Sequence, residues 1–276
     1  MLAKVSELER SAVRQQETSE AAAPRSRDVA VSLKHCSLSF GSVKVLNDVT
    51  LDIYKNEFVS ILGPSGCGKS TLLRLMLELL KPDRGGEVTY ASKKPSIGIV
   101  FQKPVLMPWL TTIQNVELTL NVGPNKRMPK MERREKAENA LGLVGLQDFR
   151  NHYPHQLSGG MQQRISIARA LAADPEILLM DEPFGALDEL TREKLNFELL
   201  RLWEDPSNSL STVVMVTHSI QESVIMSDRV VMMSPRPAGV EALVPVPLPR
   251  PREVGMEEHP SFYQTVKELR KRVKEQ

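Results

Sequence analysis

Cysteine, aromatic residues and net charge are all scarce in this chain. Among 276 residues there are two cysteines, 5% aromatic residues and a formal net charge of +2. Because Cys36 and Cys67 lack the spacing of metal ligands, neither a disulfide framework nor a cysteine zinc site is expected. The small net charge gives no global field that attracts nucleic acid, although it leaves room for a local basic patch. No apolar run approaches the roughly 20 residues that span a bilayer.

The remaining composition is that of an ordinary folded domain. Hydrophobic residues make up 41% of the chain and charged residues 25%, and the length is sufficient for a sizeable core. We therefore expect a soluble, intracellular protein.

Residues 1–28 differ from the rest of the chain. They hold five basic and five acidic residues, no aromatic residue, and the sequence Ala-Ala-Ala-Pro at 21–24. Secretory signals have an apolar middle and transit peptides contain few acids, so neither is indicated. We predict a flexible N-terminal extension over 1–28, with a partner-binding helix over 4–18 as the alternative.

From residue 29 onward, short strand-like segments alternate with helical ones, which predicts an α/β fold. Strands are predicted at 29–33, 49–53, 57–62, 87–90, 97–101, 177–180, 212–217 and 229–233. Helices are predicted at 70–80, 111–120, 130–143 and 161–173. The last three helices indicate a helical insertion at about 104–175.

The C-terminal residues 246–276 are predicted to form an extended arm and a helix. Prolines at 245, 247, 249 and 251 favour an extended backbone, and the helix is expected from about 260 to 274. One face of it would carry Phe262, Val266, Leu269 and Val273. We expect this face to dock on the core and the basic side to be solvated; a lipid-binding patch is the alternative.

A phosphate-binding loop is predicted between the strand at 57–62 and the helix that follows it. Residues 63–70 read GPSGCGKS, which fits two glycines bracketing four residues, then lysine and serine. The glycines let backbone N–H groups approach phosphate oxygens, and the helix N-terminus favours the same anion. Lys69 is expected to contact the β- and γ-phosphates of a nucleotide, and Ser70 to ligate Mg²⁺. A glycine-rich turn without a ligand is the alternative.

Two acids end a second, strongly apolar strand. Residues 176–182 read EILLMDE, the pattern of a central parallel strand covered on both faces. Asp181 is expected to hold the Mg²⁺ shell through water, and Glu182 to reach the water that attacks the γ-phosphate. Alone this pattern is weak; together with the phosphate loop it indicates nucleotide hydrolysis.

Residues 157–164 read LSGGMQQR and resemble the signature of ATP-binding-cassette (ABC) proteins. Ser158, Gly159 and Gly160 open a predicted helix, where backbone N–H groups can bind an anion. In that family the signature of one subunit contacts the nucleotide held by the other subunit. The resemblance implies a P-loop NTPase core with an antiparallel β subdomain and an inserted α-helical subdomain. Met161 stands where the family often has glutamine.

The other positions of the family pattern are also present. By resemblance, Gln102 senses Mg²⁺ and water, Asp188 lies in a loop that bridges two subunits, and His218 contacts the γ-phosphate. Phe40 matches the aromatic residue that stacks on adenine; a core position is the alternative. The implied catalytic residues are Lys69, Gln102, Glu182 and His218. The implied nucleotide contacts are Phe40, Gly63, Pro64, Ser65, Gly66, Cys67, Gly68, Lys69, Ser70, Thr71, Ser158, Gly159, Gly160 and Asp188. The implied Mg²⁺ contacts are Ser70, Gln102 and Asp181.

The resemblance covers residues 29–275, with an ABC ATPase domain at 29–245, and is most like the nitrate/sulfonate/taurine branch of bacterial importers. Stretches at 100–111, 153–161, 181–188 and 234–237 carry it. It implies an ATP-hydrolysing importer subunit on the cytoplasmic face of the inner (plasma) membrane, for a small nitrogen- or sulfur-containing anion. The implied partners are a second copy, integral membrane permease subunits and a periplasmic or lipid-anchored substrate-binding protein, with no nucleic acid.

Two rival functions remain open at this point. A soluble ABC-type ATPase acting on DNA or ribosomes usually carries two fused cassettes or a long coiled coil, whereas this chain has one phosphate loop and no sustained heptads. A small-molecule kinase should lack the sequence at 157–164.

Two side-chain environments are also predicted. Met107 and Trp109 are expected to face the membrane partners, with the core of the helical insertion as the alternative. The Cys67 thiol is expected to be accessible to maleimide.

Overall fold

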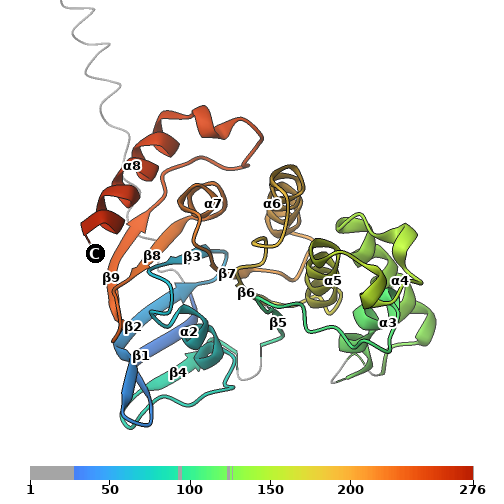
Figure 1. Cartoon of the computed structure of the whole chain (residues 1–276), viewed down its shortest axis with the longest axis horizontal. Helices are drawn as coiled ribbons and strands as arrows, with labels where there is room; N and C mark the ends of the chain where they lie inside the picture. The colour runs from blue at the N-terminus through green and yellow to red at the C-terminus, as the bar shows by residue number, and fades with distance from the viewer. Residues whose placement is uncertain (1–27, 93–94, 123–124, 126, 276) are drawn as a thin grey trace, which may run out of the picture.

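The described part of the chain consists of two β-sheets, the helices that pack on them and a separate group of helices (Figure 1). The structure is a computed structural model, and it describes residues 28–92, 95–122, 125 and 127–275. The extension predicted for 1–28 therefore lies outside the described residues, apart from residue 28.

The larger sheet has six strands in the order β5-β6-β7-β3-β8-β9. The first five strands are parallel, and β9 pairs antiparallel with β8. All residues of β3, β6 and β7 are buried, as the apolar sequence of central strands predicts. The strands are β5 (Ile97–Val100), β6 (Ile177–Asp181), β7 (Thr212–Val216), β3 (Phe58–Leu62), β8 (Arg229–Met233) and β9 (Val240–Pro245).

The two faces of this sheet belong to different hydrophobic clusters. Because successive side chains of a strand point to opposite faces, Phe58 and Leu62 of β3 join one cluster, while Val59 and Ile61 join the other. The same alternation holds along β6 and β7. The core is therefore layered on both faces of the sheet.

The smaller sheet is antiparallel, with the order β2-β1-β4. Its strands are β1 (Val29–Phe40), β2 (Val43–Tyr54) and β4 (Glu87–Tyr90). Together with α2 (Lys69–Met76) it covers the second face of the larger sheet, and these elements share one hydrophobic cluster. In Figure 1 the small sheet and α2 lie below the larger sheet.

The helical insertion forms the end of the molecule opposite β1, β2 and β9 (Figure 1). It contains α3 (Thr112–Glu117), a short 3-10 turn (Leu118–Asn121), α4 (Lys130–Leu143) and α5 (Gly159–Leu171). These helices pack on one another, and α5 also contacts β5.

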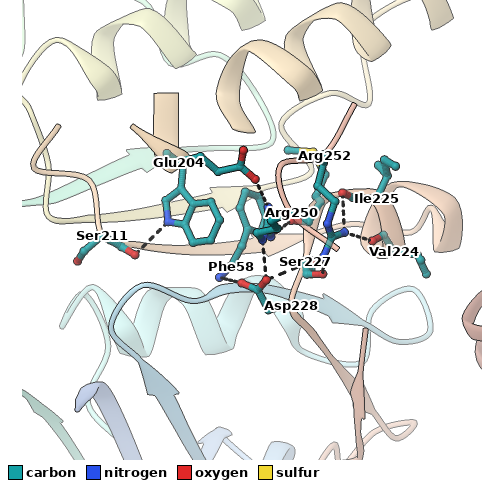
Figure 2. Close-up of polar contacts among 11 residues, drawn as sticks. Phe58, Glu204, Ser211, Val224, Ile225, Ser227, Asp228, Arg250 and Arg252 are labelled. Carbon is teal, nitrogen blue, oxygen red and sulfur yellow. Dashed lines mark hydrogen bonds and ion pairs between the residues drawn. The ribbon is translucent and has the colours of Figure 1, made fainter. Parts of the chain in front are cut away.

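Helices α6 (Glu189–Glu204) and α7 (Ile220–Met226) lie on the remaining face of the larger sheet, and α8 (Pro260–Glu275) packs on α7. The arm that precedes α8 is fixed by two arginines (Figure 2). Arg250 forms ion pairs with Glu204 and Asp228, and buried Arg252 donates hydrogen bonds to carbonyl groups at the end of α7. The arm thus joins α6, α7 and β8.

The predicted strands and helices are confirmed, with differences at their ends. Strand β1 is seven residues longer than predicted. The prediction omitted the outer half of the strand, which is mostly exposed and pairs only with β2. Helix α2 ends at Met76, and Glu78 has a positive φ of 55° that a helix cannot continue through. Elements α6, α7 and β9 were not predicted. Val273 is 42% exposed, so it does not share the buried face of Phe262, Val266 and Leu269.

Candidate active site

The phosphate loop follows β3 and ends in α2, where the sequence predicts it. A Cβ at Gly63 would lie 2.9 Å from the Met233 carbonyl oxygen, so β8 leaves room only for glycine. Gly68 has φ 128°, a conformation that L side chains rarely adopt, and its backbone passes against Val45 and Leu46 of β2. Close neighbours on two sides therefore fix the path of the loop.

The Lys69 side chain is 7% exposed and folds back over this loop. Its Nζ donates hydrogen bonds to the carbonyl oxygens of Gly63 and Pro64, at 2.8 and 2.9 Å. The ammonium group is thereby held at the N-terminus of α2, where the backbone amides also favour an anion.

Arg236 is a contact of the loop that sequence reasoning did not assign. Its guanidinium donates to the Gly66 carbonyl oxygen at 2.5 Å. Arg236 belongs to the Ser-Pro-Arg-Pro sequence at 234–237, which was recognised only as a feature of an importer branch. No sequence pattern predicts this contact, because residues 66 and 236 lie 170 positions apart.

Ser70 and Asp181 form the candidate Mg²⁺ site. Asp181, at the end of β6, is 8% exposed, and among the described residues its Oδ1 has no hydrogen-bond partner. Burial raises the pKa of Asp181 above its ordinary value. A hydrogen bond with the Ser70 side chain and the nearby Arg74 and Lys69 cations oppose only part of that rise. A buried carboxylate oxygen that lacks a donor, next to a serine hydroxyl, fits a hard divalent cation. The residues present therefore fit Mg²⁺.

Glu182, the next residue, has a strained backbone. Its φ is 46°, in the left-handed region that costs a non-glycine residue energy, and such outliers cluster at functional sites. Its N–H donates to the Val216 carbonyl oxygen of β7 at 2.9 Å. This turn presents the side chain at the carboxyl edge of the sheet.

Two other predicted residues meet the Glu182 side chain. Gln102 Nε2 donates to Glu182 Oε2 at 3.1 Å, and His218 Nδ1 lies 3.6 Å from the same oxygen. Gln102, Glu182 and His218 follow β5, β6 and β7, which are adjacent and parallel. An amide, a carboxylate and an imidazole are therefore gathered beside the Ser70–Asp181 site, an arrangement able to orient a water molecule and accept its proton.

Glu222 and Arg192 are further polar neighbours that were not predicted. They line one small hollow together with Glu182, Thr217 and His218. Glu222 is 8% exposed. An acid in the first turn of a short helix is common, so nothing in the sequence distinguishes Glu222.

The sequence at 157–164 places a second loop at the start of α5. Ser158 caps the helix, because its Oγ accepts a hydrogen bond from the Met161 N–H at 3.2 Å. A Cβ at Gly160 would lie 3.2 Å from the Ala186 carbonyl oxygen, whereas at Gly159 it would meet nothing within 4 Å in the described part of the chain. One glycine therefore packs on the loop before Asp188, and the other faces outward.

Asp188 has a structural partner of its own. It caps α6 by accepting the Thr191 N–H at 3.0 Å, and this hydrogen bond lowers the pKa of Asp188. The Ser158–Gly160 segment and the Asp188 loop thus lie side by side.

Phe40 ends β1 opposite Val43 and is 50% exposed. The core alternative for Phe40 is therefore wrong. Strand β2 begins at this hairpin and then passes against Gly68. A single strand therefore connects Phe40 with the phosphate loop.

The expected accessibility of Cys67 is wrong. Its side chain is 2% exposed and packs in the cluster under the small sheet. Its Sγ lies close to Gly63, only 3.1 Å from the position that a Cβ would take there.

The segment after Gln102 forms an exposed platform. Trp109 is 70% exposed and Val105 50%, so the core alternative is wrong for Trp109. The buried Asn115 side chain holds the platform: Oδ1 accepts the Met107 N–H at 2.7 Å, and Nδ2 donates to the carbonyl oxygens of Met107, Leu110 and Thr111. The backbone beneath Trp109 is therefore fixed.

Comparison with known proteins assigns the family. The family model described as ABC transporter matches residues 46–185. An uncharacterized ABC transporter ATP-binding protein of Methanocaldococcus jannaschii is 48% identical over 215 residues, covering 76% of this chain and 78% of that protein. The taurine import ATP-binding protein TauB of Roseobacter denitrificans is 41% identical, covering 72% of this chain and 73% of that protein.

A solved structure agrees with these relatives. The dimeric, post-hydrolysis structure of an ATP-binding cassette bound to ADP and Pi superposes with a TM-score of 0.69 and 39% identity, over 78% of this chain and 98% of that one. Within the described residues, no helix is both long and apolar enough to cross a bilayer. The fold is a P-loop NTPase core with an antiparallel β subdomain and helices. The chain belongs to the ABC transporter family, in which it is an ATP-binding subunit with ATPase activity.

Proposed function

We propose that this chain is the ATP-hydrolysing subunit of an importer for a small nitrogen- or sulfur-containing anion. It would work at the cytoplasmic face of the membrane, with integral permease subunits and a separate substrate-binding protein. The ABC ATPase domain is proposed to span residues 29–245. The observation that carries the catalytic part is the convergence of Gln102, Glu182 and His218 beside the phosphate loop.

The proposed chemistry follows from that cluster. Glu182 accepts a proton from the attacking water, His218 contacts the γ-phosphate, and Lys69 binds the β- and γ-phosphates after leaving its loop carbonyls. Ser70, Asp181 and Gln102 would hold Mg²⁺, which neutralises phosphate charge. The strained turn at Glu182 keeps the carboxylate at a fixed place before substrate binds.

A head-to-tail pair of subunits would complete the site. The Ser158–Gly160 segment packs through Gly160 on the loop before Asp188 and leaves Gly159 exposed to solvent. In the proposed pair this segment contacts the nucleotide held by the phosphate loop of the other copy, and Asp188 lies in the interface. Phe40 would stack on adenine.

Coupling to the permease subunits is proposed to pass through the Trp109 platform. An exposed tryptophan on a rigid backbone is the kind of anchor that dominates protein interfaces. Gln102 precedes Trp109 by seven residues, so the platform is linked along the chain to the residue that contacts Glu182.

Reconstitution in proteoliposomes tests the importer function. The chain is purified together with the permease subunits encoded beside it, and ATPase activity is measured with the binding protein and nitrate, taurine or an alkanesulfonate. We expect one of these anions to stimulate hydrolysis and to be accumulated. The proposal fails if hydrolysis responds to DNA or ribosomes and to none of these anions.

Trp109→Ala tests the platform in the same assay. We expect it to weaken the assembly with permease subunits and to lower stimulated transport. Tyr263→Ala is the matched control, since this aromatic side chain is 71% exposed on α8. Equal effects of both substitutions would contradict the platform.

A further inference from the structure

A buried carboxylate lies beside the His218 loop and has no role in the mechanism above. Glu222 is in the first turn of α7, four residues after His218, and is 8% exposed. Removing an acid from water is costly unless hydrogen bonds and opposite charges compensate. Glu222 is therefore expected to hold the groups that it contacts in place.

Three hydrogen bonds close a ring around the backbone of His218. The Thr217 hydroxyl donates to the Glu222 carboxylate. The Ser219 N–H donates to Thr217 Oγ1 at 3.1 Å, and the Glu222 N–H donates to Ser219 Oγ at 3.2 Å. Because Thr217 is 2% exposed, this ring anchors the residues on both sides of His218 to the buried end of β7.

The His218 side chain has little of its own to hold it. It is 67% exposed, and its Nδ1 lies 3.6 Å from Glu182 Oε2, longer than a hydrogen bond. The position of the imidazole is thus determined mainly by its backbone, and the backbone by the ring through Glu222.

Charged and titratable groups from three segments face Glu222. Arg192 comes from α6, His218 from its own loop, and Glu182 from the end of β6. Burial raises the pKa of Glu222 above its ordinary value, and the hydrogen bond from Thr217 and the Arg192 guanidinium oppose only part of that rise. Arg192 also donates to the Leu187 carbonyl oxygen at 3.0 Å, next to Asp188. Arg192 thereby connects the surroundings of Glu222 with the loop that leads to Asp188.

We propose that Glu222 is a positioning residue for ATP hydrolysis: through Thr217 and Ser219 it holds His218 at its place beside Glu182. Glu222 acts on the backbone and does not touch the nucleotide. The inference rests on the proposed role of His218 and extends it to a second buried group.

Steady-state kinetics of purified variants measure this role. Glu222→Ala is expected to lower kcat about 10- to 100-fold, the effect of a misplaced catalytic group, while the KM and Kd for ATP stay near wild type. Thr217→Val, which keeps the shape and removes the hydroxyl, should act in the same direction. Glu222→Gln retains an oxygen acceptor for Thr217 and should restore most of kcat. Gln221→Ala, an exposed neighbour on α7, is the matched control.

A double-mutant cycle separates positioning from a purely structural role. If Glu222 acts through His218, then Glu222→Ala causes no further loss of kcat in a His218→Ala background. A purely structural role would lower the free energy of unfolding and leave kcat per folded molecule unchanged. If Glu222→Ala does not fold, Thr217→Val takes its place in the cycle.

Two results would overturn the inference. They are additive losses in the cycle, or wild-type kcat in both Glu222→Ala and Thr217→Val. If His218→Ala alone hydrolyses ATP at the wild-type rate, the proposed role of His218 fails as well. If only His218→Ala is impaired, the proposed function stands and the role of Glu222 is rejected.

Discussion

Gln102 and Glu182 are joined by a hydrogen bond of 3.1 Å across 80 positions of the sequence. The amide donates to Oε2, the same oxygen that lies 3.6 Å from His218 Nδ1. That oxygen is one of the two that can accept a proton from water, so a shift of Gln102 changes what Glu182 is free to bind. Because Gln102 begins the segment that leads to Trp109, we propose that movement of this segment changes the availability of the carboxylate.

Glu182→Gln should abolish most hydrolysis and preserve ATP binding. The amide cannot accept the water proton, and loss of one general base typically costs about 10²–10⁴ in rate. Single-turnover hydrolysis and equilibrium ATP binding measure the two effects. With ATP the variant should elute as a dimer, and without ATP as a monomer. Near wild-type turnover would exclude Glu182 as the base.

Phe40→Ala should weaken ATP binding by about 1–3 kcal/mol, the range for aromatic–base stacking in nucleic-acid complexes. The kcat should change little, because the contact acts equally on ground and transition states. Val43→Ala is the control, since Val43 lies opposite Phe40 and is 48% exposed. Unchanged nucleotide affinity in Phe40→Ala, measured by calorimetry, would exclude adenine stacking.

Asp181→Asn should stabilise the nucleotide-free fold, relative to wild type, as pH rises, and should weaken Mg²⁺-dependent hydrolysis. The raised pKa of Asp181 means that its contribution to stability is full below about pH 3.8 and is lost as pH rises through the higher folded value. Asparagine does not titrate. The free energy of unfolding of the variant, relative to wild type, should therefore increase as pH rises above 4 in the absence of nucleotide.

Urea unfolding between pH 4 and 8 measures this difference, and groups common to both proteins cancel. In the same variant, Mg²⁺-dependent hydrolysis should fall about 10- to 100-fold, as for other groups that hold a metal through water. A stability difference that decreases with rising pH would contradict the assignment of burial as the main cause.

The sequence predicted five of the six strands of the larger sheet, because short, mostly apolar runs are typical of buried strands. Strand β9 was missed, and most of its residues are not buried. Gln102 and His218 were identified by resemblance to ABC proteins, and the structure brings both to Glu182 because all three follow adjacent parallel strands. Helix α6 was missed, and only five of its residues are buried. The contact of Arg236 with Gly66 was missed because it joins two loops 170 positions apart. The contacts of Asn115 and Glu222 were missed because they depend on the path of a neighbouring loop, which no sequence pattern specifies.

Arg252→Ala should destabilise the fold. Arg252 donates hydrogen bonds of 2.8–3.0 Å to the carbonyl oxygens of Val224, Ile225 and Ser227 (Figure 2). Burial and the neighbouring Arg250 lower the pKa of Arg252 to about 10, so it stays charged at neutral pH. Its loss leaves these carbonyl groups without a charged donor, which should lower the free energy of unfolding by roughly 2–3 kcal/mol.

Arg272→Ala is the matched control in urea unfolding. Arg272 pairs with Glu268 on the exposed side of α8, and such pairs contribute about 0.5 kcal/mol or less. If both substitutions had equally small effects, the arm would not stabilise α7.

Gly159→Ala tests the proposed pairing of subunits. A Cβ at Gly159 meets no atom within 4 Å in the described part of the chain, so the folded monomer has room for it. The free energy of unfolding should stay near wild type or rise slightly, since alanine favours the helix. In a Glu182→Gln background, however, the added methyl group would enter the space that the other copy's nucleotide occupies. The ATP-dependent dimer should then weaken at least about tenfold, equal to 1.4 kcal/mol, as measured by sedimentation velocity.

Gly160→Ala differs in its cause, because a Cβ there lies 3.2 Å from the Ala186 carbonyl oxygen and Leu187 Cδ2. It should weaken the monomer as well as the dimer. A Gly159→Ala variant that dimerises with wild-type affinity would show that this outward face does not contact nucleotide held by a second copy, and the head-to-tail arrangement would be rejected.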